Sequence, residues 1–204
     1  MSSGRWHDGF TPEIADALHR AAQLCHELNQ LPPSAADRRD KIIHALFGTI
    51  GSRYHINTPF RCDIGHNIHI GDRFLCNFNV AILDEAPVTI GDNVFIGPNT
   101  TICTVTHSLD AEQRNAGIMR AQPITIGNNV WLGAGVTVMP GVSIGDGAVV
   151  GAGSLVTHSL PSRVVAYGSP SRAIRATTAP DQLRAPTQIH SDRITQPPAN
   201  TPLS

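Results

Sequence analysis

His107 is the side chain in this chain of 204 residues that is best suited to proton transfer at neutral pH. A neutral imidazole can take a proton from a reacting group because its pKa lies near the working pH. Three carboxylates, those of Asp63, Asp84 and Glu85, could accept hydrogen bonds from the hydroxyl groups of a ligand. As solvated loop acids they would need no such role, so the residue types alone leave both interpretations open.

The histidines and cysteines are not spaced as metal ligands. His66 and His69 lie three residues apart, and on an extended chain they face opposite sides, so we expect no metal site. The cysteines show no CxxC or finger-like spacing, which predicts neither a zinc finger nor a disulfide framework. No apolar run has the length of a signal peptide or a membrane span. We therefore expect a cytoplasmic protein with free thiols at positions 25, 62, 76 and 103.

The element that must position these residues is a repeat with a period of six. From Ile126 to Val156 an aliphatic residue falls on every sixth position, usually followed by glycine. A helix has a period of 3.6 and a strand a period of 2, whereas a fixed period of six is typical of a hexapeptide β-helix. We expect glycine, Asp or Asn after each inward residue to occupy corners whose backbone is costly for other residues. The same count continues backward through Ile64, Ile70, Cys76, Ile82, Ile90, Ile96 and Ile102.

Two insertions interrupt the sixes. Two extra residues lie in the region 84–87, and an excursion over 103–123 leaves the pattern altogether, with His107 near its start. An irregular excursion from a regular wall usually accommodates function. This position singles out His107 from the other histidines.

The flanks of the repeat predict helices and a tail. Thr11 as an N-cap and Pro12 at the first helical position indicate one helix. Ser34 and Asp37 have the spacing of a capping box for a second. The predicted organisation is a loose leader (1–10), a helical hairpin (11–50), a hexapeptide β-helix (54–160), a C-terminal segment (161–175) and a disordered tail (176–204).

Composition limits the partners. Hydrophobic residues make up 41% of the chain and aromatic residues 5%, which fits a thin prism filled by Ile, Val and Leu. The net charge of −1 and the pI of about 6.8 argue against a nucleic-acid partner or a membrane-surface patch.

Five segments together resemble one family. The runs FRCDIGHNIHIGD (60–72), CNFNVAILDE (76–85), TVTHSLDAEQRNAG (104–117) and YGSPSRAIR (167–175), with the repeat over 123–157, are similar to the maltose and galactoside O-acetyltransferases. These form the sugar branch of the hexapeptide acyltransferases. The resemblance implies a mostly β fold, a left-handed parallel β-helix, in a homotrimer that transfers acetyl from acetyl-CoA in a cleft between subunits.

The resemblance also implies roles for the acceptor-side residues. His107 matches the family's general base, and Asn77 matches a position near the acceptor hydroxyl and the thioester. Asp63, Asp84 and Glu85 match contacts to the acceptor sugar. The implied reaction is direct attack of the acceptor hydroxyl on the thioester, without an acyl-enzyme.

For the coenzyme the resemblance implies a second set of residues. Trp131 matches a tryptophan beside the pantetheine, and the N–H of Ala134 matches a donor to the oxyanion. His158 stands where the family usually has lysine, which weakens one cationic contact. The remaining matches are pantetheine contacts at Ala152 and Thr157 and phosphate-binding arginines at Arg172 and Arg175.

Three alternatives remain open at this level. A γ-carbonic-anhydrase-type lyase shares the prism but needs a trio of histidines, and no other histidine lies within five residues of His107. A non-catalytic prism would act as a scaffold or binding module. Within the transferase class, the acceptor could be a natural product, an antibiotic or a lipo-oligosaccharide instead of a simple sugar.

Overall fold

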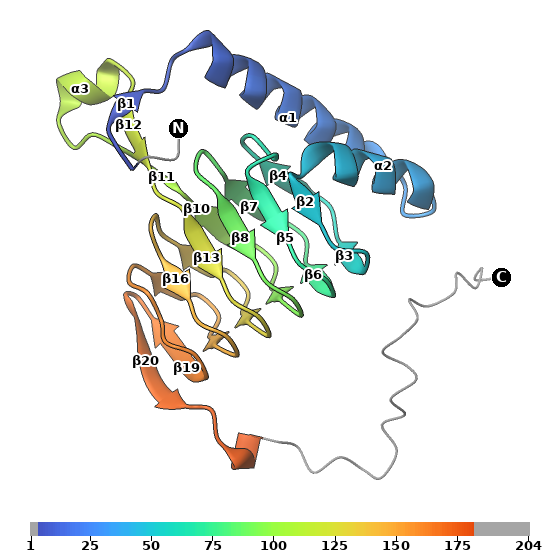
Figure 1. The fold of residues 1–204 in the computed structure, drawn as a ribbon, viewed down its shortest axis with the longest axis vertical. Coiled ribbons are helices and arrows are strands. Elements are labelled where there is room, and N and C mark those ends of the chain that lie inside the picture. The colour runs from blue at the N-terminus through green and yellow to red at the C-terminus, as the bar shows by residue number, and fades with distance from the viewer. Residues whose placement is uncertain (1–3, 182–204) are drawn as a thin grey trace.

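In the computed structural model of the protein, which describes residues 4–181, short strands coil into a three-sided parallel β-helix (Figure 1). Each turn of the chain contributes one strand to each of three sheets. Sheet I contains β2 (Thr49–Ile50), β5 (Ile68–Ile70), β8 (Val88–Ile90), β13 (Ile124–Ile126) and β16 (Ser143–Ile144). Sheet III contains β4 (Phe60–Cys62), β7 (Val80–Leu83), β10 (Thr101–Cys103), β15 (Thr137–Val138) and β18 (Leu155–Val156).

Sheet II is the longest of the three. Its strands are parallel except for β20, which turns back antiparallel onto β19. In chain order sheet II contains β3 (Tyr54–Ile56), β6 (Phe74–Cys76), β9 (Phe95–Ile96), β14 (Trp131–Leu132), β17 (Val149–Val150), β19 (Val164–Gly168) and β20 (Ser171–Ala176).

The register of the sheets stacks the predicted inward residues. In sheet I, Ile70 pairs with Ile90, Ile90 with Ile126, and Ile126 with Ile144. In sheet III, Ile82, Ile102, Val138 and Val156 form the corresponding row. All of these side chains are buried. The period of six therefore predicted the core correctly.

The glycines after the inward residues allow neighbouring coils to approach closely. A Cβ on Gly91 would lie 2.6 Å from Asn128 Oδ1, and a Cβ on Gly127 would lie 2.2 Å from Asp146 Oδ1. The left-handed backbone falls two residues after these glycines, at Asn93 (φ 56°) and Asn129 (φ 57°). Gly91 and Gly127 therefore do not take the costly conformation themselves, whereas Gly65, after the inward Ile64, does (φ 80°), as do Asn93 and Asn129.

Asp and Asn side chains next to these glycines link each coil to the one before it. The Asp72 N–H donates to Asp92 Oδ1 (2.7 Å), the Asp92 N–H to Asn128 Oδ1 (2.8 Å) and the Asn128 N–H to Asp146 Oδ1 (2.7 Å). This ladder satisfies corner N–H groups that the short strands leave unpaired.

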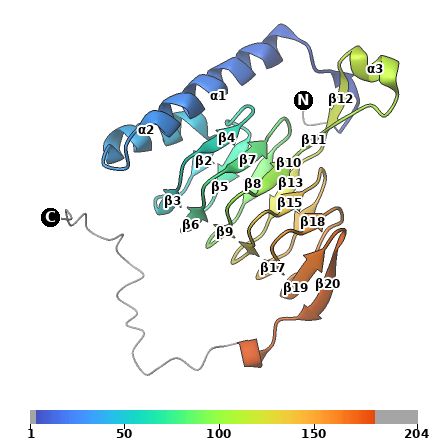
Figure 2. The ribbon, with the colours of Figure 1, turned by 180° about the vertical axis from the view of Figure 1, so that it is seen from behind.

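Helices α1 (Pro12–Gln30) and α2 (Ala36–Leu46) form a hairpin across the N-terminal end of the coil (Figures 1 and 2). Thr11 is the N-cap of α1, as predicted. The capping box predicted at Ser34 was wrong, because Ala35 is the N-cap of α2 and forms no side-chain cap. The Asn29 amide donates to Phe60 O and accepts from Phe60 N, both at 2.9 Å. These two bonds dock α1 onto β4.

The excursion folds into a small antiparallel sheet that projects from the coil beside the start of α1 (Figure 1). It consists of β11 (Val105–His107), helix α3 (Ala111–Asn115) and β12 (Ile118–Ala121), and its third strand is β1 (His7–Asp8). The Gly9 N–H donates to Gly117 O at 2.9 Å. The predicted loose leader is therefore ordered at residues 7–10.

A short 3₁₀ helix, η1 (Ala179–Asp181), follows β20. The predicted disordered tail lies outside the described residues from residue 182 onward. None of the helices within residues 4–181 is long and apolar enough to cross a membrane.

Candidate active site

Most of the predicted site residues lie on two different edges of the prism, whereas the coenzyme residues Thr157 and His158, in the turn after β18, lie on the same edge as the excursion. The III–I edge consists of the turns that lead from sheet III to sheet I, and it carries Asp63, Asp84, Glu85 and the excursion with His107. The II–III edge consists of the turns from sheet II to sheet III, and it carries Asn77, Ala134 and Ala152. Sheet III separates the two edges within one chain. A single chain therefore holds the two halves of the predicted site apart.

Asp84 is a structural residue of the III–I edge. It is fully buried, and its carboxylate accepts backbone N–H bonds from Asp63 (3.1 Å), Ile64 (2.9 Å) and Gly65 (2.7 Å). The Asn67 side chain donates to its carbonyl oxygen (2.7 Å). These bonds give the Asp84 carboxylate a structural role in the turn after β4, and an additional contact to the acceptor stays a prediction.

Glu85 differs from its neighbour. It is only 6% exposed, and Oε2 is buried without a hydrogen-bond partner among the described residues. Burial, followed by the charge of Asp63, raises the pKa of Glu85. Burial and the charge of Asp84 raise the pKa of Asp63 to about 6. The structure thus brings Asp63 and Glu85 together beside Asp84, and their contacts to the acceptor stay a prediction.

His107 lies at the end of β11 with an exposed side chain. It pairs with Met119, which pairs in turn with His7 of β1. His7 acts electrostatically on Glu85, and its Nε2 is buried without a partner among the described residues. Sequence reasoning missed His7 because a two-residue strand has no periodic signal.

The loop after His107 is closed by Ser108. Its hydroxyl donates to Gln113 Oε1 (2.8 Å) and accepts from the Asp110 N–H (3.2 Å), and Asp110 caps α3. The Ser108 hydroxyl is therefore occupied by the loop and is not placed as a nucleophile for His107.

On the II–III edge, Ala134 and Ala152 belong to adjacent coils and are exposed. The Gly153 N–H donates to Ala134 O at 2.8 Å, which holds the two turns in register. Trp131, 54% exposed, lies on the outer face of sheet II between Phe95 and Val149. Asn77 Oδ1 accepts the Phe78 N–H at 2.9 Å, which leaves one lone pair of this oxygen and the NH2 group for a ligand. Asn79 has a left-handed backbone (φ 58°), and its side chain donates to Asn99 Oδ1 at 3.1 Å.

A cavity of about 280 Å³ at the C-terminal end of the coil gathers two of the predicted coenzyme residues, His158 and Arg172. Thr157 Oγ1 lies 2.8 Å from His158 Nδ1. Ser171, which sequence reasoning missed, lines the cavity and has a buried Oγ without a partner among the described residues. Arg175 is not in this cavity. Its guanidinium donates two hydrogen bonds of 2.7 Å to Asp181.

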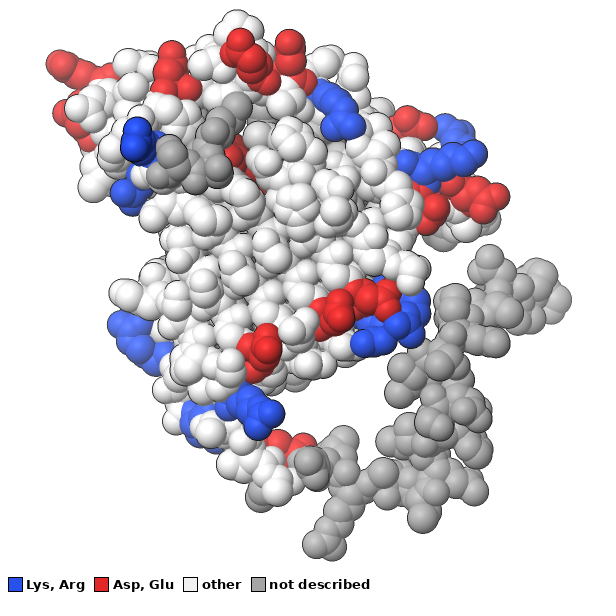
Figure 3. Space-filling model, viewed as in Figure 1, with Lys and Arg blue, Asp and Glu red and all other residues white. Residues whose placement is uncertain are grey.

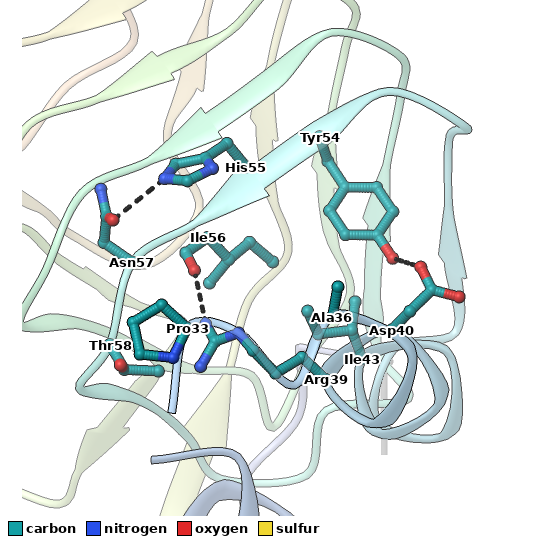
Figure 4. A pocket seen from close by; sticks show the side chains of 10 residues that line it. All are labelled: Pro33, Ala36, Arg39, Asp40, Ile43, Tyr54, His55, Ile56, Asn57 and Thr58. Atoms are coloured by element: carbon teal, nitrogen blue, oxygen red, sulfur yellow. Dashed lines mark hydrogen bonds between the residues drawn. The ribbon is translucent and has the colours of Figure 1, made fainter. Parts of the chain in front are cut away.

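Another cavity, of about 390 Å³, lies between the helical hairpin and β3 (Figure 4). Its polar side chains bond to their surroundings: the Tyr54 hydroxyl donates to Asp40, Arg39 donates to Ile56 O (3.0 Å), and His55 pairs with Asn57 (3.0 Å). No predicted site residue lines it. We interpret it as part of the hairpin's packing.

Within residues 4–181 no three His, Cys, Asp or Glu side chains are grouped as metal ligands. His69 contacts Thr49 Oγ1 at 3.2 Å, and His66 lines a cavity beside α1.

Family comparisons agree with this architecture. Residues 1–51 match the maltose acetyltransferase hexapeptide capping motif, residues 87–106 match the hexapeptide repeat of succinyl-transferase, and residues 123–158 match the bacterial transferase hexapeptide. A galactoside O-acetyltransferase of Escherichia coli K12 is 45% identical over 175 residues, which cover 86% of each chain.

Two solved structures have the same fold. A galactoside acetyltransferase in complex with coenzyme A has a TM-score of 0.85 at 42% identity, covering 88% of this chain and 90% of that chain. A hexapeptide-repeat acetyltransferase of Vibrio cholerae O1 biovar eltor, complexed with acetyl coenzyme A, has a TM-score of 0.81 at 39% identity, covering 87% and 96%.

The fold and repeat define the hexapeptide-repeat acyltransferases, and the predicted left-handed parallel β-helix is confirmed. Within that class the chain belongs to the maltose and galactoside acetyltransferase family, and it is an acetyltransferase.

Proposed function

We propose that the protein is an acetyl-CoA-dependent O-acetyltransferase that acts on a hydroxyl group of a sugar or glycoside. The observation that carries this proposal is His107 on the excursion, next to the carboxylates of the III–I edge, in a chain whose relatives bind coenzyme A and are named for galactoside acetylation. The reducing cytoplasm is the proposed location, in keeping with four free cysteines.

The chemistry follows from the residues present. His107 takes the proton of the acceptor hydroxyl while the oxygen attacks the thioester carbonyl. The Ala134 N–H donates to the oxyanion, and collapse of the tetrahedral intermediate breaks the C–S bond. Coenzyme A leaves as the thiol once its sulfur is protonated. Direct attack is supported by the nearby candidate nucleophiles being occupied, since Ser108 donates to Gln113 and Cys103 Sγ donates to Val105 O (3.2 Å).

The proposed active unit is a homotrimer in which the III–I edge of one copy faces the II–III edge of the next. Two observations support it. The two halves of the site lie on different edges of one chain. The outer face of sheet II also exposes an apolar row at Leu75 (37%), Phe95 (50%) and Trp131 (54%), which a second copy would cover.

The test is a screen of sugars, glycosides, natural products and lipo-oligosaccharides with acetyl-CoA, in which the released thiol is detected. His107→Ala should lower kcat by about 10²- to 10⁴-fold, because a positioned general base contributes that much. The matched control is His26→Ala, an exposed histidine on α1, which should retain full activity. Equal activity of His107→Ala and the parent protein would reject the mechanism.

Subunit mixing tests the shared site. His107→Ala and Ala152→Trp each damage one edge, so each is expected to be nearly inactive alone. After the two variants are unfolded and refolded together, mixed trimers should regain activity at the interface that has both edges intact. A mixture that stays as inactive as its parts would place the site within one chain.

A further inference from the structure

Helix α1 and the III–I edge enclose a cavity of about 300 Å³ on the same edge as the excursion. Glu13 and Ala17 of α1 form one wall, and residues of the turns after β4 and β7 form the other. The sequence analysis assigns Glu85 of this cavity to the acceptor, and it assigns no ligand to the other lining residues. The residues that line the second wall are Ile64, His66, Asn67, Glu85 and Pro87.

The cavity is negatively charged. Two carboxylates, Glu13 and Glu85, line it, and none of the lining residues is Lys or Arg. Burial and the charges of Asp63 and Asp84 raise the pKa of Glu85, whereas His7 lowers it. Glu13 lies in the first turn of α1, where backbone N–H groups and Thr11 lower its pKa and keep it ionised.

Glu85 points to a missing ligand. It is more than nine-tenths buried, it lines the cavity, and Oε2 has no partner among the described residues. A buried carboxylate without a partner is costly, and the cost is removed by a donor that enters with the ligand. The adjacent Asp84 is also buried, but backbone N–H groups of the turn after β4 donate to its carboxylate, so it needs no ligand.

We propose that this cavity binds a protonated amino group of the acceptor, so that the substrate class is an amino sugar or another amine-bearing polyol. This inference rests on the proposed function and specifies its acceptor. A neutral hydroxyl donates one hydrogen bond to a carboxylate but leaves the negative charge of the site in place. An ammonium group donates three hydrogen bonds and compensates the charge, and charge-assisted bonds are about twice as strong as neutral ones.

The position of the cavity accounts for transfer to oxygen. Glu85 lies near His7, and His7, Met119 and His107 are successive register partners across the excursion sheet. Two strand spacings, about 10 Å, therefore separate the row of His7 from that of His107. A nitrogen that is held protonated by carboxylates has no lone pair and cannot attack the thioester. The hydroxyl whose proton passes to His107 becomes the nucleophile instead.

Glucosamine and glucose, which differ only in the amino group at one carbon, form the test pair. At saturating acetyl-CoA, kcat/KM should be at least tenfold higher for glucosamine with the parent protein. Glu85→Gln should bring the ratio of the two values close to one, and Glu13→Gln should lower it less. Glu112→Gln, an exposed acid on α3, is the matched control and should leave the ratio unchanged. Equal values for both sugars in the parent protein, or an unchanged ratio in Glu85→Gln, would overturn the proposal.

Two further readouts separate this inference from the proposed function. The glucosamine product should be an ester that hydroxylamine cleaves, and a hydroxylamine-resistant amide would contradict the bound ammonium. Calorimetric titration of glucosamine into the parent protein and Glu85→Gln measures binding without turnover. If no acceptor releases thiol while glucosamine binds and Glu85→Gln weakens that binding, the proposed function fails and the amine site stands. If acceptors release thiol but glucosamine does not bind in preference to glucose, the proposed function stands and the amine site fails.

Discussion

Ionisable side chains are buried at the proposed acceptor end of the coil and exposed at the proposed coenzyme end. The acceptor end, formed by the turns after β4 and β7 with α1, contains the buried Asp84 and Glu85. The coenzyme end, formed by β18 to β20, presents Arg172 and Arg175 on the surface. Figure 3 shows a broad uncharged area on the coil, with charged side chains above it at the helical end and a row of acidic and basic side chains below it.

This difference matters for selection of the two substrates. A buried charge that needs a partner discriminates strongly between ligands, because the wrong ligand leaves it unsatisfied. An exposed charge attracts any anion and is screened by salt. The variable acceptor would therefore be selected at the buried end, and the common coenzyme would be held at the exposed end.

The largest expected effect comes from comparing Asp84 with Glu85. Asp84→Ala leaves the Ile64 and Gly65 N–H groups without their acceptor, whereas the Asp63 N–H keeps its bond to Ile82 O, so the change should lower the free energy of unfolding by on the order of 3 kcal/mol. Glu85→Gln removes a buried charge without a partner and should leave stability unchanged or raise it. Urea unfolding followed by circular dichroism measures both. The comparison fails if the two variants lose stability equally.

At the coenzyme end the expected effects are smaller. Arg175→Ala should raise the KM for acetyl-CoA by up to about tenfold at low salt, as befits an exposed phosphate contact, and by less at high salt. Asp181→Asn weakens the ion pair that holds the Arg175 guanidinium, so it should lower the KM for acetyl-CoA a few-fold. Arg38→Ala, which removes an exposed pair with Glu27, is the control. An increase in KM for Asp181→Asn would show that the pair positions Arg175 for the coenzyme.

The smallest effect concerns Asp63 and pH. Its pKa is raised to about 6 in the folded protein, above the usual value of 3.8, so the folded state holds its proton more tightly than the unfolded state. Asp63 therefore reduces stability as pH rises from about 4 to 6, and the loss stays constant above that range. Asp63→Asn should raise the melting temperature at pH 7.5 and not at pH 3.5. A shift of equal size at both pH values would contradict this linkage.

Periodicity predicted the interior of the protein, and resemblance predicted much of the site. The sixes identified inward residues such as Ile102 and Val138 because only one side chain per hexapeptide points into so thin a prism. The departure of residues 103–123 from the period of six singled out His107 from the other histidines. The assignment of the corner glycines failed at Gly91 and Gly127 because the sequence does not reveal how closely the next coil approaches.

The features that the sequence did not predict are contacts between segments that are distant in the chain. Asp84 and Glu85 are adjacent acids of similar type, and only the turn after β4 determines that one is locked and the other is free. The pairing of β1 with β12 and of Arg175 with Asp181 likewise depends on three-dimensional proximity. Such short contacts leave no periodic signal in the sequence.

The register of the coil also sets a unit of length for insertions and deletions. Ile126 and Ile144 occupy equivalent places in consecutive turns, so one circuit of the prism spans eighteen residues. Removal of a whole circuit would shorten the prism while keeping every later aliphatic side chain inside. Loss of a single residue would instead turn the next strand inside out, as a frameshift scrambles the codons that follow it.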